Sequence, residues 1–469
     1  MLCRKPPSHD RTRARERASN SADTSRFLGR STALACLLLL AASSTWGAEY
    51  QRDEQGTPTS AIEIGSLLDA LQPDEVERRL GIFSDWLRDW EVLPRVLRES
   101  TIDLKLRTYH FEQDLDTGQV ARATTLGAHL GLNTGSVYGW QAGLTWYSAY
   151  EISSNDNGAA TLLLAQNRDD ISVLGKAFVR YSNEGWQLDL FRQEINLPYI
   201  NKLDSRMIPN TFEAYSVSHD GIKIDLFASH ITDMKTRSDD EFRSMAQVAG
   251  VDDDKGASVV GARYAFREGV DVGAMILNSW DLFRTIYAEA NWFYELPFEA
   301  QYKVSVQYTD QRSSGDELLG EFNTWTAGVR GVLSYKNIVA SASFTQTSDG
   351  AGIKSPYGGR PSYNSLMISD FDRAGEKSWH AAISYEFTRI GIEGLGLSAH
   401  YAKGWDAARR FSLNLADRNE WDVTLEYKPD GGFFRGFWLR LRYATVEQAD
   451  GTLDRDQVRV ILNYEVPVS

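Results

Sequence analysis

The sequence predicts an all-β protein: a transmembrane antiparallel β-barrel of about eighteen strands with a short N-terminal helical segment. Three observations lead to this prediction. Apolar and polar residues alternate with a period of two from about residue 100 to the end of the 469-residue chain. The connections between these segments alternate between short turns and long loops, and aromatic residues gather at segment ends. Together these features are typical of barrels that cross an outer membrane.

Composition excludes several other classes of protein. The chain has no continuous apolar run of roughly 18 residues, so it is not a helical membrane protein. Aromatic residues make up 12% of the chain, which argues against intrinsic disorder. The formal net charge of -14 argues against a nucleic-acid partner, because such proteins present a basic surface.

The first 48 residues have the pattern of a secretory signal peptide. A basic segment is followed by the short apolar run TALACLLLLAA at 32–42 and by small residues, with cleavage expected after Ala48 or Gly47. Both cysteines, Cys3 and Cys36, lie in this segment. The mature chain would therefore have no disulfide, and its stability must come from hydrogen bonds and packing.

Residues 49–99 are expected to form a periplasmic linker followed by a helical segment. Pro73 is followed by two acidic residues, as at a helix N-terminus, and Pro94 is expected to end the helix. Between them, apolar residues recur at helical spacing: Val76, Leu80, Phe83 and Leu87. Two interpretations remain open: a helix packed on the main fold, or one that occludes the mouth of the barrel.

Residues 100–469 are predicted to form the barrel. Eighteen segments of about the length of a tilted membrane strand show the alternation. They lie at 102–109, 122–134, 137–150, 171–182, 185–195, 212–220, 222–231, 257–267, 270–279, 282–294, 299–309, 322–335, 337–347, 378–388, 394–404, 419–428, 436–447 and 454–465.

Connections after even-numbered strands are mostly short, and those after odd-numbered strands are mostly long. An even number of strands with this alternation places short turns at one rim and long loops at the other. In a soluble β-sandwich, which is the alternative fold, the aromatic rings would form the core and would show no bias toward strand ends.

The energy of burying charge in lipid indicates which residues face the interior. An outward-facing arginine at the bilayer midplane costs roughly 2–4 kcal/mol. In the strand near residue 440, Leu439, Leu441 and Tyr443 alternate with two arginines, which must therefore face inward. The same argument places seven further basic residues in the interior: Arg107, Lys176, Arg180, Arg263, Lys303, Arg330 and Arg459.

Four of these residues are expected to lie close together, because the last strand pairs with the first. Arg440, Arg442, Arg459 and Arg107 would form a basic ladder along one wall, on which an anion could move from rung to rung. The alternative is structural pairing, in which Asp422 and Glu426 on the neighbouring strand neutralise Arg440 and Arg442.

Several segments resemble the OprD family of substrate-specific porins from Gram-negative outer membranes. The resemblance covers the chain from about Ser100 to its end. It is specific at five motifs: ESTIDLKLRTYHFEQD in the first strand, GKAFVR at 175–180, LPYINKLDSRMIPNTFEAY at 197–215, PSYNSLMISDFDRAGEKSW at 361–379 and DRDQVRVILNY at 454–464.

This resemblance implies a monomeric eighteen-stranded channel whose long loops fold inward to narrow the pore. It implies passive uptake of small, mostly carboxylate-bearing solutes along the basic ladder. It also implies that Asp204, Ser205, Arg206, Thr211 and Phe212 belong to an infolded constriction loop. Two features depart from the family: the long stretch at 62–98, and the C-terminus, YEVPVS, which lacks a terminal aromatic residue.

The expected partners are a small organic solute, outer-membrane lipid and lipopolysaccharide, and the barrel-assembly machinery. No cofactor or metal is expected. The alternative functions are a general diffusion porin without carboxylate specificity and an outer-membrane hydrolase. The hydrolase is disfavoured because none of the histidines lies in a metal-binding or nucleophile motif. The acidic run at 252–254 suggests a divalent-ion site or, more simply, a solvated loop.

Overall fold

The computed structural model describes residues 95–298, 300–408, 415–429, 431, 434–449 and 454–466. The expected signal peptide at 1–48 and the helix expected between Pro73 and Pro94 lie outside the described residues. The described chain begins with one helical turn, α5 (Arg95–Arg98), and the first strand follows at Thr101.

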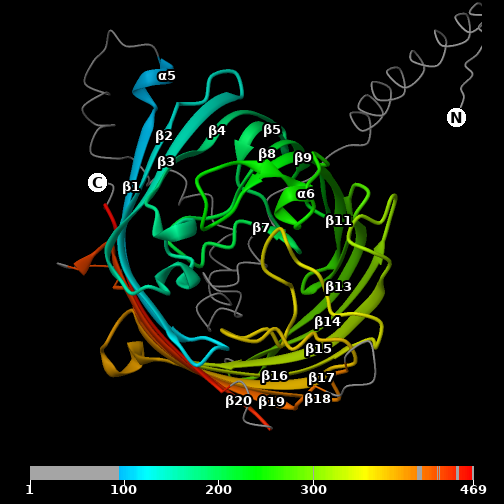
Figure 1. Ribbon diagram of the computed structural model, residues 1–469. Helices are drawn as coiled ribbons and strands as arrows, with labels where there is room; N and C mark the ends of the chain where they lie inside the picture. The colour runs from blue at the N-terminus through cyan, green and yellow to red at the C-terminus, as the bar shows by residue number, and fades with distance from the viewer. Residues whose placement is uncertain are drawn as a thin grey trace, which may run out of the picture. The chain divides into compact units, whose positions relative to one another are not determined.

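Eighteen long strands of the described chain form one closed antiparallel sheet (Figure 1). Strand β1 pairs with both β2 and β21, which closes the barrel and confirms the predicted fold class and strand number. The strands are β1 (Thr101–Asp114), β2 (Val120–Asn133), β3 (Trp140–Ser154), β4 (Ile171–Asn183), β5 (Trp186–Gln193), β8 (Thr211–His219), β9 (Ile224–Lys235), β11 (Ala257–Arg267), β12 (Val270–Ser279), β13 (Phe283–Leu296), β14 (Ala300–Ser313), β15 (Asn323–Tyr335), β16 (Ile338–Thr347), β17 (Lys377–Glu386), β18 (Leu395–Trp405), β19 (Arg418–Tyr427), β20 (Phe437–Gln448) and β21 (Arg455–Glu465).

Short elements lie in the connections. They are η2 (Gly158–Thr161), η3 (Gln166–Arg168), β6 (Asn196–Leu197), β7 (Ile200–Asn201), β10 (Arg243–Ser244), α6 (Met245–Val248) and η4 (Phe387–Ile390). Helix α6 begins at an N-cap, where the Ser244 side chain accepts a hydrogen bond from the Gln247 backbone N–H. Among the described residues, no helix has the length and apolar character needed to cross a membrane.

The two faces of the strands differ in the way that the alternation predicts. On β20, Leu441 and Tyr443 are 37% and 44% exposed on the outer surface, whereas Arg440 and Arg442 are each only 4% exposed. An apolar outer face is what the hydrocarbon core of a bilayer requires, so the arginines lie on the inner face.

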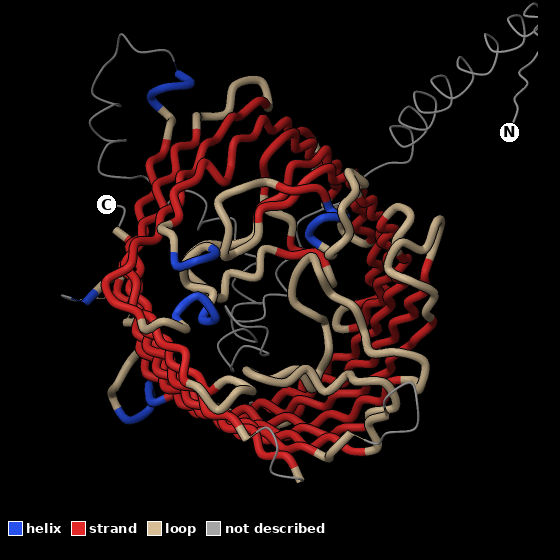
Figure 2. The backbone as a smooth tube through the Cα atoms, in the orientation of Figure 1, coloured by secondary structure: helices blue, strands red, loops and turns tan. Residues whose placement is uncertain are grey.

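Two long connections cross the interior of the barrel and meet there. The connection at 194–210 contains β6 and β7, and Figure 1 shows β7 well inside the ring of strands. The connection at 348–376 also runs through the interior, as the tan tube in Figure 2 shows. They are joined at Asn201, whose side chain accepts a hydrogen bond from the Gly359 N–H (2.8 Å) and donates one to the Gly359 carbonyl (2.9 Å).

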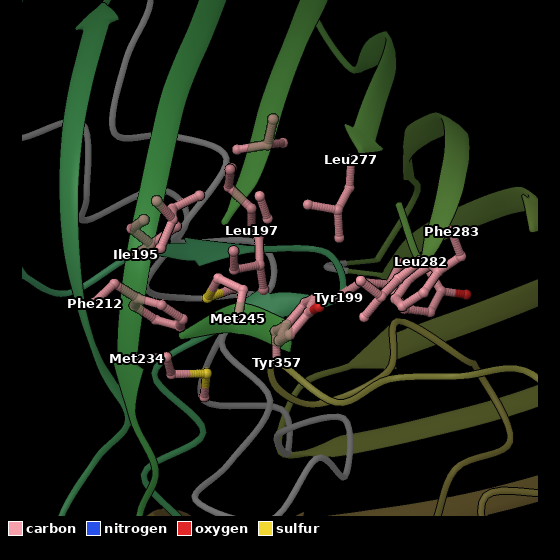
Figure 3. Close-up of a cluster of buried hydrophobic side chains, with 14 of the residues drawn as sticks. Ile195, Leu197, Tyr199, Phe212, Met234, Met245, Leu277, Leu282, Phe283 and Tyr357 are labelled. Atoms are coloured by element: carbon pink, nitrogen blue, oxygen red, sulfur yellow. The ribbon is translucent and has the colours of Figure 1, made fainter. Parts of the chain in front are cut away.

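A hydrophobic cluster attaches these connections to one side of the barrel wall (Figure 3). Leu197 and Tyr199 come from the first connection and Tyr357 from the second, and they pack with wall residues such as Phe212 and Leu277. The Tyr199 hydroxyl also hydrogen-bonds with Thr309 Oγ1 on β14 (2.8 Å). Each fully buried apolar side chain contributes roughly 1.5–3 kcal/mol, so this packing holds both connections inside.

Candidate functional site

Four arginines predicted to form a ladder occupy one continuous part of the inner wall. Arg442 on β20 is paired directly with Arg459 on β21, so their Cα atoms are neighbours across the two strands. Arg459 in turn faces Phe111 on β1, and Arg107 faces Asn463 nearer the rim at which β1 begins. Arg440 lies on the same face of β20, two residues from Arg442.

Two of these arginines are already paired with acidic residues. The Arg107 guanidinium donates to both carboxylate oxygens of Asp204, at 2.6 and 3.0 Å, and its Nε donates to Asn463 Oδ1 at 2.7 Å. Arg440 Nη2 lies 2.6 Å from Glu426 Oε2. The contact of Arg107 with both oxygens of Asp204 is geometrically specific, and Arg440 also donates from Nε to Glu426 Oε2 (2.7 Å), so each arginine is held by two contacts.

Asp204 fastens the connection at 194–210 to the wall of the barrel. Its carboxylate also lies 3.8 Å from Lys105 Nζ. Burial by itself would raise the pKa of Asp204, but the positive charges of Arg107 and Lys105 and the hydrogen bonds from Arg107 outweigh it and hold the pKa well below its usual range. Asp204 therefore stays ionised at neutral pH and keeps the loop attached.

The other predicted constriction residues have different positions. Ser205 and Arg206 lie in the inward connection and are buried. Arg206 Nε donates to the Thr161 carbonyl (2.8 Å), and its guanidinium lies 4.9 Å from the centroid of the Phe111 ring. Thr211 and Phe212 are instead the first two residues of β8, and Phe212 belongs to the hydrophobic cluster.

The structure adds a residue that the sequence did not indicate. Arg237, in the connection after β9, donates a hydrogen bond to Ser205 Oγ, next to Arg206. We call the group formed by Arg206, Arg237, Arg442 and Arg459 the arginine cluster. Arg459 also lies against the Phe111 ring, 4.5 Å from its centroid, so two guanidinium groups of the cluster contact the same ring.

The positive charges in the cluster affect one another. Burial lowers the pKa of Arg206 to about 9, with further contributions from the positive charges of Arg237 and Arg442. Burial lowers the pKa of Arg237 to about 10, and the charge of Arg459 acts in the same direction. Burial and neighbouring positive charges both disfavour the protonated form of an arginine, so lowered pKa values are expected where several buried guanidinium groups lie close together.

The tip of the second connection packs beside the cluster. Glu420 on β19 accepts hydrogen bonds from the backbone N–H groups of Ile368 (2.7 Å) and Ser369 (2.8 Å). Asp422 accepts one from the Met367 N–H (3.0 Å). The Met367 carbonyl accepts a hydrogen bond from Arg459 Nη2 (3.3 Å). The two acidic residues therefore hold the loop tip against the wall that carries the cluster.

The remaining predicted basic residues lie elsewhere on the inner wall. Arg180 on β4 is paired with Asp189, with Nε 2.6 Å from Oδ1. Lys303 lies on β14 and Arg330 on β15, where Arg330 stacks 4.4 Å from the centroid of the Tyr363 ring. The structure thus brings Arg107, Arg440, Arg442 and Arg459 together and separates Arg180, Lys303 and Arg330 from them.

A sequence signal existed for Glu420 but not for Arg237. Glu420 has the same parity as Asp422 in the strand EWDVTLEY, so the period of two places both side chains on the inner face. Arg237 lies beyond the end of its strand, where the alternation stops. No group of three or more potential metal-ligating side chains is found in the part of the chain that the structure describes.

Comparisons with known proteins agree with this architecture. The sequence model described as outer membrane porin, OprD family, matches residues 96–468. Porin D from Pseudomonas aeruginosa is 24% identical over 417 residues, which cover 79% of this chain and 92% of that protein.

Solved structures share the fold at low sequence identity. OccK9 (OpdG) from Pseudomonas aeruginosa has a TM-score of 0.73 and 22% identity, with 80% of this chain and 100% of that chain covered. OpdK from the same species, solved with vanillate, has a TM-score of 0.71 and 20% identity, covering 79% and 99%. OccAB1 from Acinetobacter baumannii has a TM-score of 0.71 and 18% identity, covering 80% and 98%.

Proposed function

The chain belongs to the OprD family of outer-membrane porins, and from this premise we propose that its channel selects small organic solutes that carry a carboxylate. As a member of this family, the protein is a channel for small solutes in the outer membrane of a Gram-negative bacterium. The proposal concerns the kind of solute and the residues that guide it, and it assigns the chain no enzymatic step.

One observation carries the proposal. Among the described residues, the hydrogen bonds of Arg206, Arg237 and Arg459 all go to uncharged oxygens. The charges of Asp370 and Asp422 act on Arg237 and Arg459 without a direct ion pair. Arg459 is only 2% exposed, and its Nε has no hydrogen-bond partner within the described chain. A buried cation without a paired anion is costly, so a solute carboxylate that enters this region gains charge-assisted hydrogen bonds.

The arrangement along the wall supports passage as well as binding. A solute can exchange one arginine for the next, because Arg442 and Arg459 are neighbours and Arg440 lies two residues away on the same face. Passage requires several sites of moderate strength rather than one tight site. OpdK, a protein of the same fold, was solved with vanillate, which is itself a carboxylate.

The alternative is a general diffusion porin in which the arginines only stabilise the barrel. The pairs Arg107–Asp204 and Arg440–Glu426 favour this alternative, because each neutralises a rung of the ladder. We also propose that the protein is a monomer inserted by the barrel-assembly machinery and surrounded by lipopolysaccharide and lipid. Aromatic residues exposed on the outer surface, such as Trp140 and Tyr335, support the contact with lipid.

Single-channel recording in a planar bilayer tests the proposal. We expect benzoate to cause brief, concentration-dependent blockades, and we expect its uncharged amide, benzamide, to cause none. Arg459→Gln should weaken the benzoate blockades by about tenfold or more, since a hydrogen bond to a charged group contributes roughly 1.5–3 kcal/mol. Arg180→Gln is the matched control, because Arg180 faces the interior but is paired with Asp189.

The control should retain the benzoate blockades of the unmodified protein. Steady openings that neither compound interrupts would contradict the carboxylate proposal and favour a general diffusion porin. Equal weakening by Arg180→Gln and Arg459→Gln would mean that net lumenal charge, and not the arginine wall, determines the binding.

A further inference from the structure

We infer that the arginine cluster binds solutes with two carboxylates in preference to solutes with one, so the preferred substrate is a small dicarboxylate. This inference rests on the proposed function, because it specifies the substrate class of the same channel. It comes from the number of guanidinium groups gathered in one place and from the partners that each of them has.

The four members of the cluster come from four different parts of the chain. Arg442 and Arg459 are paired across β20 and β21, and Arg206 meets Arg459 at the Phe111 ring. Arg237 is attached to Arg206 through Ser205, whose hydroxyl accepts its hydrogen bond and whose carbonyl accepts one from Arg206 Nη1 (2.8 Å). Two connections, 194–210 and the one after β9, and two strands thus bring their cations to one location.

Three members have only uncharged oxygens as partners. Arg206 donates to the carbonyls of Thr161 and Ser205, and Arg237 donates to the Ser205 hydroxyl. Arg459 donates to the Met367 carbonyl and to Gln457 Oε1. Neutral acceptors satisfy hydrogen bonds but leave the positive charge of each guanidinium in place.

The acidic residues beside the cluster act on it without a direct ion pair: the charge of Asp370 acts on Arg237, and that of Asp422 acts on Arg459. Asp422 and Glu420 accept the backbone N–H groups of the loop tip at 367–369. Asp370, on the same loop, is paired with Arg360 and accepts a hydrogen bond from Ser365 (2.6 Å). Closer approach of these carboxylates to the cluster would break hydrogen bonds of the loop tip or the ion pair between Asp370 and Arg360.

The charge balance therefore favours a dianion. One carboxylate can pair with one arginine in a bidentate contact, or bridge two, and it leaves at least one of the three guanidinium groups without an anion. A second carboxylate on the same molecule reaches the next guanidinium without a second loss of translational freedom. Burial lowers the pKa of Arg206 and Arg237, and the neighbouring arginines act in the same direction, whereas the charge of Asp370 acts against the shift at Arg237.

The accessible member of the cluster is Arg237. It is partly exposed, whereas Arg206 and Arg459 are 8% and 2% exposed. A solute that enters the interior would therefore meet Arg237 before it meets Arg206 and Arg459. Arg237 is therefore the residue whose removal should reduce the preference for two carboxylates while leaving the other arginines of the wall in place.

The test compares two solutes of the same size in single-channel recordings of the full-length mature protein. Succinate carries two carboxylates at neutral pH, and succinamate replaces one of them with an uncharged amide. We expect succinate to block at concentrations about tenfold lower than succinamate, which corresponds to about 1.4 kcal/mol. Raising the salt concentration should reduce this difference, because added ions screen the additional charge.

The variant Arg237→Gln should bring the blocking concentration of succinate close to that of succinamate, with little change for succinamate. Arg243→Gln is the matched control in the same connection, because Arg243 lies in a partly exposed ion pair with Asp239 (3.0 Å). Arg243→Gln should retain the preference. Folding of both variants is checked by heat-modifiable migration on a gel, because a folded barrel migrates differently before and after boiling.

The possible results separate this inference from the proposed function. Blockade by both solutes at equal concentration would overturn the dicarboxylate preference but keep a carboxylate channel. A succinate preference that survives Arg237→Gln would overturn the assignment to the cluster. Absence of blockade by either solute, and by benzoate, would remove the proposed function and this inference together.

Discussion

Arg107 and Arg459 carry the same charge and face the same interior, but their partners differ. Arg107 is fully buried and makes a two-point contact with Asp204, whereas Arg459 meets only neutral oxygens. An arginine that is already neutralised gains little from a passing carboxylate, because the solute would have to displace Asp204. The ladder is therefore uneven: Arg107 anchors a loop, and Arg459 is the better position for a solute.

Asp372 should make the second inward connection sensitive to pH. Its carboxyl is 7% exposed, and Arg360 Nε lies 3.1 Å from it. Burial raises the pKa of Asp372 to about 7, and the charges of Asp370 and Glu376 add to this effect against those of Arg360 and Arg418. An aspartate in an unfolded segment has a pKa of about 3.9. Between about pH 4 and pH 7, Asp372 is therefore protonated when the loop is folded and ionised when the loop is open.

The sign of the effect follows from proton linkage. The contribution of Asp372 to local stability is full below about pH 4 and is lost as the pH rises to about 7. We expect amide exchange at 366–373, corrected for its intrinsic pH dependence, to show easier opening at pH 8 than at pH 5. Asp372→Asn should remove this dependence, whereas Asp349→Asn, at an exposed carboxyl of the same connection, should retain it. A pH-independent opening in the unmodified protein would contradict the prediction.

At the scale of elements, the connection at 348–376 is attached to the wall at separate places along its length. Near its start, Gln311 on β14 accepts a hydrogen bond from the Lys354 N–H (2.8 Å) and donates one to the Lys354 carbonyl (2.7 Å). Near its end, the Ile368 and Ser369 N–H groups donate to Glu420 on β19. Because several strands separate β14 from β19, the connection spans part of the interior.

Glu420→Ala should release the tip of this connection. The substitution removes the acceptor of two backbone hydrogen bonds, each worth roughly 0.5–1.5 kcal/mol. We expect amide exchange of Ile368 and Ser369 to rise by tenfold or more and the open-channel current to fluctuate more strongly. The β-barrel itself should remain folded, because Glu420 pairs with the neighbouring strands through its backbone, which the substitution leaves unchanged.

Glu447→Ala provides the control, because Glu447 is an exposed glutamate on β20. It should change neither amide exchange at 367–369 nor current noise. Unchanged exchange in Glu420→Ala would mean that the hydrophobic contacts of the connection, rather than its wall hydrogen bonds, fix the tip.

At the scale of the whole molecule, the barrel places apolar side chains outside and polar ones inside. The outer surface carries exposed leucines and aromatic residues on β2, β3 and β20, such as Leu130, Trp146 and Leu441. The interior holds the inward connections and the paired charges. This inversion of a soluble protein's pattern is stable only in a bilayer, where the outer face meets hydrocarbon.

The orientation of β20 can be tested by its lipid face. Leu441→Arg should lower the free energy of unfolding in a bilayer by roughly 2–4 kcal/mol, because a cation would meet hydrocarbon. Leu441→Val at the same position should cost much less, since the side chain remains apolar. The measurement is urea unfolding of the barrel refolded in vesicles. Equal stability of the two variants would indicate that residue 441 does not face the hydrocarbon core.

The sequence by itself determined the strands and the faces of the barrel. Alternation is a local property, and the cost of exposing Arg440 and Arg442 to lipid leaves only one orientation of β20. All eighteen predicted strands are present, and the resemblance to the OprD family, recognised from segments such as 197–215, is confirmed by the match over residues 96–468. The strands and their facing need only the period of two and the energetics of one strand in a membrane, whereas the resemblance rests on the quoted motifs.

Only the tertiary structure decided which charges meet. Asp204 reaches Arg107 across 97 positions of sequence, and Asn201 reaches Gly359 across 158. The path of a connection through the interior depends on such distant contacts and leaves no periodic signal, so Arg237 could not be foreseen as a neighbour of Arg206. Nor could sequence separate Arg107, which is paired directly with Asp204, from Arg459, whose hydrogen bonds go to uncharged oxygens, because the surroundings of a buried charge are set by the loops that cover it.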